Sequence, residues 1–437
     1  MSPGRLLVVG YGSLALTGAL LLMLPVAVTT PGRLTFTEAM FTSTSAVCVT
    51  GLTVIPIGQR LSLFGQLVVL VLMQVGGMGV MTVSTLFMVL LGRRISLRGR
   101  LLVQEEIHQD YLTGLVRLVR MVAGVTLFVE GLGATLLFLA WLPLLGPGKS
   151  AYFAVFHSVS AFNNAGLDLW GTSLRGFVTD PLVVLTVAGL LMVGGIGFSV
   201  IADVSSWRPG RRLQLHSRVA LTMAGVLIAS GFLFVLAVEW HNPRTLGALP
   251  WWYRPMAAFF TAVTPRTAGF DVVPTGELRA ATLLFMLPLM FIGVSPGSTG
   301  GGIKTTTAAV VGSAVLSALS GREDLILFNR RVPRDTLYRA VSLVILAGSW
   351  CGLAAVSILV MEAMEPLSVL FEVVSAFGTV GLSTGITPDL STPSRWVIIA
   401  TMLMGRVGPV TVAMALARRS LASTGLWRYP EERVSLG

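Results

Sequence analysis

The sequence has 437 residues, of which 54% are hydrophobic and only 12% are charged, and its mean hydropathy is +0.81. Soluble domains carry about 25% charged residues, so this composition excludes a soluble globular protein and indicates a polytopic membrane protein. The net charge of +11 does not indicate nucleic-acid binding, because the arginines lie in short loops between apolar runs. Cys48 and Cys351 form neither a disulfide framework nor a metal-binding motif.

Eight apolar runs reach the length of about 20 residues that spans a bilayer. They occupy residues 6–28, 62–91, 114–143, 181–203, 218–239, 280–318, 337–361 and 395–416. The first run is too long for the apolar region of a signal peptide, so we expect a retained helix. Between the two runs of each pair lies a shorter segment, at residues 36–48, 150–162, 251–263 and 365–376. These segments are too short to cross a bilayer and are typical of re-entrant helices.

We therefore predict an all-α membrane protein of four tandem M1–P–M2 repeats, where M1 and M2 are the long helices and P is the short one. Eight transmembrane helices and four re-entrant pore helices would surround a pseudo-fourfold pore. The expected repeats comprise residues 1–92, 93–207, 208–321 and 322–420, and a cytoplasmic tail comprises residues 421–437. Arginines are concentrated in the connections between repeats and after the last span. The positive-inside rule therefore places both termini in the cytoplasm and the short helices on the outer side.

The loops that follow the short segments match one another position by position. They read AVCVTGLT from Ala46, AFNNAGLD from Ala161, TPRTAGFD from Thr264 and AFGTVGLS from Ala376. Such internal similarity indicates duplicated structural units. Small residues beside a glycine can turn backbone carbonyls toward one axis and replace the hydration shell of an ion. The predicted ion selectivity filter comprises Val49, Thr50, Gly51, Asn164, Ala165, Gly166, Thr267, Ala268, Gly269, Thr379, Val380 and Gly381.

The third M2 run contains a segment, residues 293–304, that cannot remain helical because it holds Pro296 and several glycines. Irregular backbone at membrane depth is tolerated only where it is buried in protein or lines a wet cavity. We therefore predict an intramembrane gating loop below the filter. The predicted gating residues are Gly297, Ser298, Thr299, Gly300, Gly301, Gly302, Lys304 and Arg406. A phosphate-binding loop does not fit, because Ile303 separates the last glycine from the lysine.

Arg406 lies inside the last apolar run, where an unpaired cation costs about 2.5–3.5 kcal/mol. It either pairs with backbone carbonyls of a broken helix, or lies below the filter, bonds to the gating loop and raises the barrier to a passing cation. The two roles are compatible. Arg266, inside the third filter loop, is expected to brace that loop from behind.

Two carboxylates occupy equivalent positions in the aligned loops. Asp168 and Asp271 each follow their glycine by two positions. They are either ordinary solvated loop carboxylates or negative charges at an outer mouth that raise the local concentration of cations. We predict the second arrangement, because the positions are equivalent.

The four-repeat plan, the four loop glycines, the Pro296–Lys304 loop and Arg406 together resemble the Trk/Ktr/HKT superfamily of potassium transporters over nearly the whole chain. With eight spans and no additional N-terminal pair, the sequence is more similar to the KtrB branch than to the longer TrkH branch. One departure concerns the residue two positions before each glycine. It is threonine in only two repeats, at Thr267 and Thr379, whereas the others have Val49 and Asn164.

The resemblance implies a K⁺-selective pore, with K⁺ at the filter carbonyls and Na⁺ as an activator. It also implies a homodimer in the inner membrane of a prokaryote, with a cytosolic ring of RCK-type regulatory subunits similar to KtrA or TrkA. Nucleotide is expected on those subunits and not on this chain.

We predict potassium uptake through a channel-like pore. The alternative is a Na⁺- or H⁺-coupled secondary cation transporter, for which inverted repeats and midplane carboxylates are typical. Here the repeats are parallel, and the candidate carboxylates Glu130 and Glu362 lie within or near the ends of first helices. A membrane enzyme is not expected, because no nucleophile–base constellation is present. The histidines are scattered at His108, His157, His216 and His241.

Overall fold

The computed structural model describes residues 3–29, 32–79, 82, 115–207, 212–321 and 324–408. Several arginines expected on the cytoplasmic side lie outside these ranges, namely those at 93–100, at 208 and 211, at 322 and beyond residue 408. His108 and the expected tail at 421–437 also lie outside them.

The described chain is almost entirely helical. In its first half the long helices are α1 (Pro3–Leu22), α4 (Leu63–Met78), α7 (Leu115–Phe162), α8 (Pro181–Ile196) and α9 (Phe198–Ser205). In the second half they are α10 (Leu215–Glu239), α12 (Ala280–Phe291), α13 (Thr305–Leu319), α14 (Arg334–Met361) and α16 (Thr392–Val407). Three short helices are separate elements, namely α2 (Phe36–Val47), α11 (Arg254–Val263) and α15 (Pro366–Gly378).

Small elements complete the connections. They are the helical turn α3 (Ile57–Arg60) and the 3-10 helices η1 (Pro25–Ala27), η2 (Arg175–Phe177), η3 (Leu246–Ala248), η4 (Thr275–Glu277) and η5 (Thr387–Asp389). An antiparallel hairpin pairs β1 (Ile326–Leu327) with β2 (Arg330–Arg331), with Ile326 opposite Arg331.

Local sequence explains where several helices begin and bend. Thr35 and Glu38 form a capping box at the start of α2, in which each side chain bonds to the backbone N–H of the other residue. Asp180 caps α8 by accepting from Leu182 N–H at 2.9 Å. Within α7, Gly146 has φ of 72° and bends the helix, so that its last part forms the predicted short helix at 150–162.

Four described helices are long and apolar enough to cross a membrane, and they include the first long helix of each expected repeat. They cover Arg5–Leu22, Val119–Phe162, Leu215–Glu239 and Arg334–Met361. The helices α8 and α9, which meet at 94°, form a fifth candidate if they are counted as one span. The chain is therefore a helical membrane protein.

The remaining long helices are shorter because each is interrupted. Gly79, Gly197 and Gly408 end α4, α8 and α16 with nearly the same dihedrals, φ of 91°, 98° and 93° and ψ of 132°, 134° and 138°. The third interruption is different, because α12 ends at Phe291 and loop 293–304 leads to α13.

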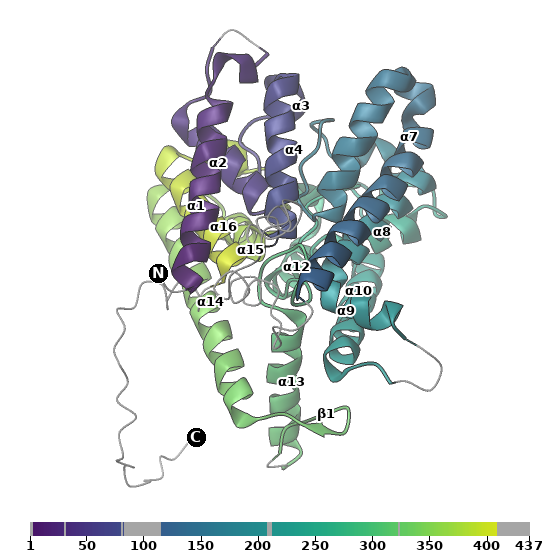
Figure 1. Cartoon of the computed structure of the whole chain (residues 1–437), viewed down its shortest axis with the longest axis vertical. Coiled ribbons are helices and arrows are strands. Elements are labelled where there is room, and N and C mark those ends of the chain that lie inside the picture. Colours follow the sequence, from purple (N-terminus) through teal and green to yellow (C-terminus); the bar gives the residue numbers. More distant parts are fainter. Residues whose placement is uncertain are drawn as a thin grey trace.

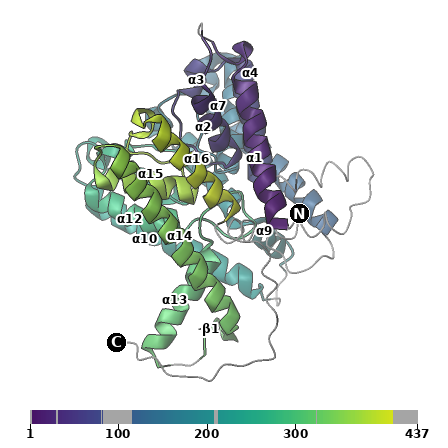
Figure 2. The same cartoon turned by 90° about the vertical axis from the view of Figure 1, so that its left-hand side faces the viewer.

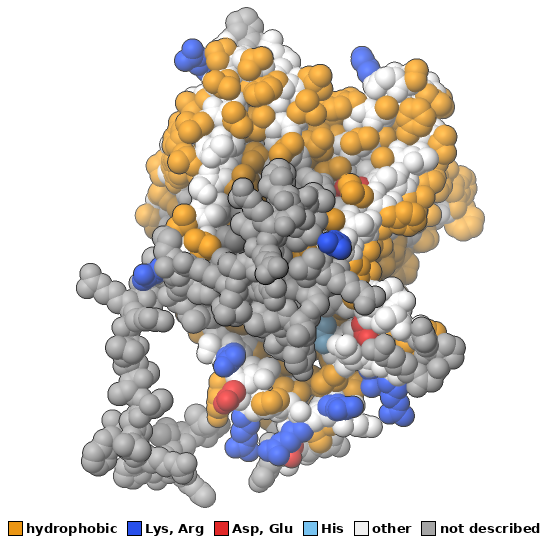
Figure 3. All heavy atoms as spheres, viewed as in Figure 1, with side chains coloured by type: hydrophobic (Ala, Val, Ile, Leu, Met, Phe, Trp, Pro, Cys, Tyr) orange, Lys and Arg blue, Asp and Glu red, His pale blue; other side chains and the backbone are white. Residues whose placement is uncertain are grey.

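Figures 1 and 2 show the helices gathered in one body, from which α13 and α14 extend together at the lower end, joined by the β hairpin. Apolar side chains cover much of the upper part of the visible face, whereas Lys and Arg side chains gather around the hairpin end (Figure 3). This distribution is typical of a bilayer-embedded body with a basic end outside the hydrocarbon.

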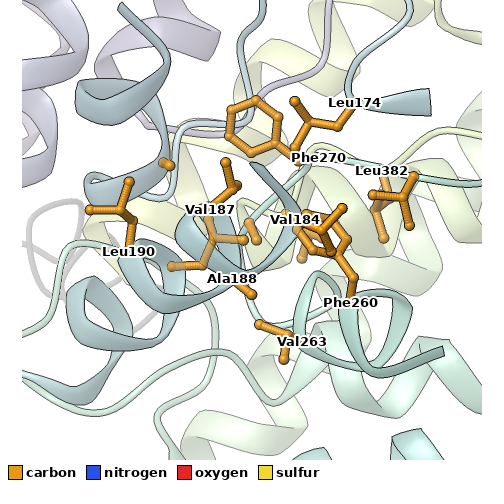
Figure 4. Packing of buried hydrophobic residues seen from close by; sticks show 14 of the residues in the cluster. Leu174, Val184, Val187, Ala188, Leu190, Phe260, Val263, Phe270 and Leu382 are labelled. Carbon is orange, nitrogen blue, oxygen red and sulfur yellow. The ribbon is translucent and has the colours of Figure 1, made fainter. Parts of the chain in front are cut away.

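The core anchors the loops that follow the short helices. Phe270 and Leu382 belong to the same buried cluster as Val184 and Val187 of α8 and Phe260 of α11 (Figure 4). Each of the two loop residues directly follows one of the aligned glycines, at 269 and 381. The loops are therefore fixed to the helices by hydrophobic packing rather than left free.

Candidate functional site

The four aligned loops share one unusual backbone feature. The residue two positions before each glycine has a positive φ although it is not glycine: 50° at Val49, 57° at Asn164, 63° at Thr267 and 51° at Thr379. All four residues are fully buried. A positive φ is unfavourable for such side chains, so the surrounding structure must hold these residues in place. Its recurrence at equivalent positions means that the four loops have the same local conformation.

The glycines of these loops lie against one another and form what we call the glycine ring: Gly51, Gly166, Gly269 and Gly381. In each case an added Cβ would meet the carbonyl oxygen of the residue before the next glycine. The distance from the added Cβ to the carbonyl oxygen would be 2.7 Å from Gly51 to Ala165, 2.8 Å from Gly166 to Ala268 and 2.5 Å from Gly269 to Val380. A Cβ on Gly381 would overlap the carbonyl oxygen of Thr50. The order closes on itself, since the fourth loop meets the first. The structure thus brings together residues that the sequence separates widely.

A hydroxyl at the base of each loop holds it against its short helix. Ser45 and Ser375 accept from the N–H groups of their ring glycines at 3.0 and 3.1 Å. Ser160 and Thr264 instead donate to the carbonyl of the residue after the glycine, at 2.7 and 2.5 Å. The first and fourth loops are therefore braced in one way, and the second and third in another.

The second long helices pack directly on the ends of the short helices. At the end of a short helix, a Cβ on a glycine of the long helix would overlap a backbone carbonyl, at Gly76 with Val47, at Gly194 with Phe162 and at Gly405 with Phe377. Contact this close requires glycine, as in small-residue packing of membrane helices. These three glycines therefore serve the packing of the long helices on the short ones.

Loop 293–304 lies between α8 and the glycine ring. On the α8 side, Thr299 donates to the carbonyl of Gly194 from its N–H at 3.2 Å and from its hydroxyl at 3.1 Å. Beyond the break at the end of α8, Phe198 N–H donates to the carbonyl of Gly297 at 2.9 Å. The backbone of the loop is therefore paired with protein and is not exposed to lipid.

On the ring side, the loop touches two residues that precede ring glycines. Gly301 N–H donates to the hydroxyl of Thr379 at 2.9 Å. A Cβ on Gly300 would overlap the hydroxyl of Thr267. The loop thus lies directly beside the third and fourth ring loops.

The two ends of the loop are tied together. Ile292 and Ile303 form an isolated parallel β-bridge, and Gly302 N–H donates to the carbonyl of Gly405 in α16 at 3.2 Å. Lys304 turns back, and its Nζ donates to the carbonyl of Gly300 at 2.8 Å. The lysine therefore closes the loop internally.

Arg406 of α16 connects the loop to another helix. Its Nη1 donates to the carbonyl of Thr299, and its Nη2 donates to Gly76, with a further bond of 3.3 Å to Gly77. The salt bridges of the described residues do not include Arg406. Backbone carbonyls of α4 and of the loop therefore satisfy this cation. Its expected effect on a passing cation stays a prediction.

The two equivalent carboxylates, Asp168 and Asp271, lie close enough to interact electrostatically. Arg175 donates to Asp271 in a bidentate manner, with Nη2 at 2.7 Å. Asp168 accepts from the N–H groups of Gly171 at 2.6 Å and Ser173 at 3.1 Å. Burial raises the pKa of Asp168 above its ordinary value, and these N–H groups oppose the shift. Sequence reasoning did not find the pairing of Arg175, because no spacing pattern links it to Asp271.

Arg266 is a residue of the third loop and is only 8% exposed. It borders a cavity of about 10 Å³ together with Leu191 of α8 and Val294 of loop 293–304. Its Nε atom has no hydrogen-bond partner. The expected bracing role stays a prediction. Among the described residues, no group of three or more His, Cys, Asp or Glu side chains could hold a metal ion.

These features define a class: a helical membrane protein in which loops that follow short helices meet in a closed ring of glycines beside an irregular, largely buried loop. The TrkH family of cation transport proteins matches residues 13–429, and the chain belongs to this family, as the sequence motifs predicted.

Curated relatives match the chain along its full length. Ktr system potassium uptake protein B of Bacillus subtilis is 37% identical over 436 residues, which cover 100% of this chain and 97% of that protein. The protein of the same name from Vibrio alginolyticus is 38% identical and covers 99% of this chain and 94% of its own length. Potassium/sodium uptake protein NtpJ of Enterococcus hirae is 35% identical, with coverage of 100% and 98%.

A solved structure has the same fold. The potassium transporter TrkH from Vibrio parahaemolyticus superposes with a TM-score of 0.74 at 19% sequence identity, over 95% of this chain and 85% of that one.

Proposed function

We propose that this chain takes up potassium through a pore whose selectivity filter consists of backbone carbonyls of the four aligned loops. The observation that carries the proposal is the closed order of contacts in the glycine ring, where each glycine meets a carbonyl of the next loop. Rings of backbone carbonyls replace the hydration shell of a monovalent cation in potassium channels. The full-length relatives are potassium uptake and potassium/sodium uptake proteins, which supports K⁺ as the transported ion.

We propose further that the fold consists of four M1–P–M2 repeats around a pseudo-fourfold axis, with the boundaries expected from the sequence. Three repeated features support this: the positive φ before each ring glycine, the helix glycines beneath the short helices, and the matching dihedrals where α4, α8 and α16 end. In the third repeat, loop 293–304 takes the place of the glycine break.

Loop 293–304 is proposed to be the gate. Its position beside Thr267 and Thr379 and its bond to Arg406 support an obstruction directly beneath the filter. Opening would require the loop to leave these contacts. Deletion of residues 298–301 should therefore raise K⁺ flux, whereas unchanged or lower flux in correctly folded protein would contradict gating.

Regulation is proposed to involve a homodimer and a cytosolic ring of RCK-type subunits, with Na⁺ as an activator and both termini in the cytoplasm. The exposed arginines of the β hairpin, Arg330 and Arg331, support a basic cytoplasmic end.

A Na⁺- or H⁺-coupled transporter is the second candidate. It is favoured by Glu130, a carboxylate within α7 that is only 7% exposed. Uptake measured against imposed proton and sodium gradients separates the two, because a channel-like pore accumulates K⁺ only to its own electrochemical equilibrium.

The central experiment measures K⁺, Rb⁺ and Na⁺ flux into liposomes for the wild type and for Gly381→Ser. Gly381 has φ of 89°, and a side chain there would overlap the carbonyl of Thr50, so the substitution should weaken selectivity or K⁺ affinity. Gly189→Ser in α8 is the matched control, because an added Cβ there meets nothing within 4 Å. A Gly381→Ser protein with the selectivity of the wild type would refute the filter.

A further inference from the structure

Three polar side chains meet behind the second ring loop, and we call them the Glu130 triangle: Gln74 of α4, Glu130 of α7 and Asn163 at the end of α7. Asn163 Nδ2 donates to Glu130 Oε1 at 2.9 Å and to Gln74 Oε1 at 3.1 Å. Gln74 Nε2 donates to Glu130 Oε2 at 3.3 Å. Asn163 is fully buried, and Glu130 is nearly so. The triangle therefore links the first expected repeat to the second within the membrane.

The first repeat provides an internal comparison for the carboxylate. Ser158 donates to the main-chain carbonyl of Glu130 at 2.6 Å, and Ser43 donates to that of Ala15 at the same distance. Ala15 is therefore the counterpart of Glu130, and the long helix packs on its short helix in the same way with either residue. Packing does not require the carboxylate, and alanine fits this position.

The other two members also differ from the residues at the equivalent positions of the other repeats. The position of Gln74, two residues before the packing glycine, is occupied in α8 and α16 by Met192 and Leu403. The position of Asn163, three residues before the ring glycine, is occupied in the other loops by Cys48, Arg266 and Gly378. Gln74 in α4 and Glu130 in α7 thus stand where the compared repeats have apolar residues, and these two polar side chains contact each other. Because polar groups at membrane depth are costly, such a coincidence indicates function.

The triangle touches the proposed filter on one side. Asn163 directly precedes Asn164, which has φ of 57° and whose side-chain oxygen accepts from the Thr267 hydroxyl at 3.1 Å. A shift of Asn163 therefore displaces both the second loop and its contact with the third.

On the other side the triangle holds the end of α4. Gln74 lies two and three residues before Gly76 and Gly77, whose carbonyls accept from Arg406. The three salt bridges of the described residues do not include Glu130, and its carboxylate accepts from the amides of Gln74 and Asn163.

We propose that Glu130 is a positioning residue that fixes the second ring loop relative to the end of α4 and thereby determines the preference of the ring for K⁺ over Na⁺. Its two carboxylate oxygens each accept from a different segment, so the carboxylate sets the spacing between them. Without it, the Asn163 and Gln74 amides lose a charged acceptor, and the loop is free to adopt other spacings. The size and flexibility of a carbonyl site determine which ions it binds. A looser loop should therefore reduce the difference in affinity between K⁺ and Na⁺. The inference rests on the proposed filter.

The test uses the full chain and two readouts, the K⁺/Na⁺ flux ratio in liposomes and the difference between Tm in K⁺ and Tm in Na⁺. Bound ions stabilise the folded state, so the wild type should have a higher Tm in K⁺. We expect Glu130→Ala to reduce the flux ratio about tenfold, as the loss of hydrogen bonds to a charged acceptor implies, and to remove most of the ion-specific Tm difference. The double variant Glu130→Gln/Gln74→Glu keeps one carboxylate in the triangle and should restore most of the ratio.

Ile228→Ala is the matched control. Gly231 contacts Leu289 as Gly133 contacts Leu190, so Ile228 in α10 is the counterpart of Glu130 in the third repeat. This control should lower Tm equally in both ions and leave the flux ratio unchanged.

The outcomes are distinct. If Glu130→Ala lowers Tm equally in both ions and leaves the flux ratio unchanged, Glu130 is only a structural brace and the inference is wrong. If it abolishes coupled uptake but keeps the ratio, the inference is also wrong and the coupled transporter is supported. A wild type without K⁺ preference, or an unaltered ratio in Gly381→Ser, overturns the proposed filter itself and the inference with it.

Discussion

The guanidinium of Arg406 donates a hydrogen bond to the carbonyl of Thr299, a residue 107 positions earlier in the chain. The same guanidinium donates to Gly76 and Gly77 in α4. One side chain therefore ties together α16, loop 293–304 and α4. Hydrogen bonds to a charged donor contribute about 1.5–3 kcal/mol each, so this contact is a substantial part of what keeps the loop in place.

Replacement of Arg406 should open the proposed gate. Glutamine offers two N–H donors instead of five and carries no charge, so Arg406→Gln should release the Thr299 carbonyl and raise K⁺ flux about tenfold or more. Flux into liposomes at equal protein loading is the measurement. Arg395→Gln is the control, because Arg395 bonds to the carbonyl of Pro388 at an exposed site. Reduced flux through a folded Arg406→Gln protein would argue against a closing role.

An added methyl group should lower the stability of the protein at Gly194 of α8 but not at Gly189 of the same helix. A Cβ on Gly194 would overlap the carbonyl of Phe162, whereas one on Gly189 meets nothing within 4 Å. We expect Gly194→Ala to cost about 1–3 kcal/mol through overpacking, and Gly189→Ala to be neutral or stabilising by up to about 1 kcal/mol. Thermal unfolding in detergent compares the two variants directly. Equal Tm values for both would mean that α8 does not pack on the short helix as closely as described.

If Asp168 and Asp271 lie at an outer mouth of the pore, as we propose, removal of Arg175 should strengthen K⁺ capture there. Arg175 forms an ion pair with Asp271 and neutralises the negative charge of this carboxylate, which lies at the end of the third ring loop. In Arg175→Gln the free carboxylate should attract cations and lower the KM for K⁺ roughly fivefold, the equivalent of about 1 kcal/mol, with a smaller effect at high ionic strength. Arg244→Gln, which breaks the exposed pair with Glu277, should leave KM unchanged. The prediction is wrong if both variants behave alike.

The raised pKa of Asp168 gives a pH dependence with a defined sign. The pKa of Asp168 in the folded protein lies above its ordinary value of 3.8, so folding favours the protonated carboxyl. The stability that this preference contributes is fully present below pH 3.8 and is lost as pH rises through the folded pKa. Asp168→Asn keeps an oxygen that can accept from Gly171 and Ser173. It should therefore have a higher Tm than the wild type at pH 7, and the difference should disappear on acidification. A Tm difference that does not vary with pH would contradict this assignment.

The same substitution tests the charge at the mouth. As external pH falls through the pKa of Asp168, the wild type should bind K⁺ more weakly, whereas Asp168→Asn should be less sensitive to pH. The KM for K⁺ measured across external pH provides the comparison.

The sequence predicted well those features that depend on local residue types. Gly381 and its three counterparts were identified because glycine beside small residues repeats after each short segment, and Arg406 because a cation in an apolar run requires a partner. The bond between Arg406 and loop 293–304 was anticipated, since a cation in an apolar run has few possible acceptors.

Features that depend on the meeting of distant segments could not be predicted. Glu130 was considered only as a candidate for ion coupling, because nothing in the sequence places Gln74, 56 residues away, beside it. The pair Arg175–Asp271 likewise joins residues 96 positions apart. The short helix at 150–162 was predicted from its length, but the sharp bend at Gly146 that separates it from the preceding span was not, because its direction depends on how the segments pack.

The closed order of the glycine ring has an evolutionary consequence. Because a single polypeptide supplies all four sectors, one codon changes one quarter of the ring, whereas in a homotetramer the same change would appear four times. Each sector can therefore diverge alone, as Val49 and Asn164 already have beside Thr267 and Thr379.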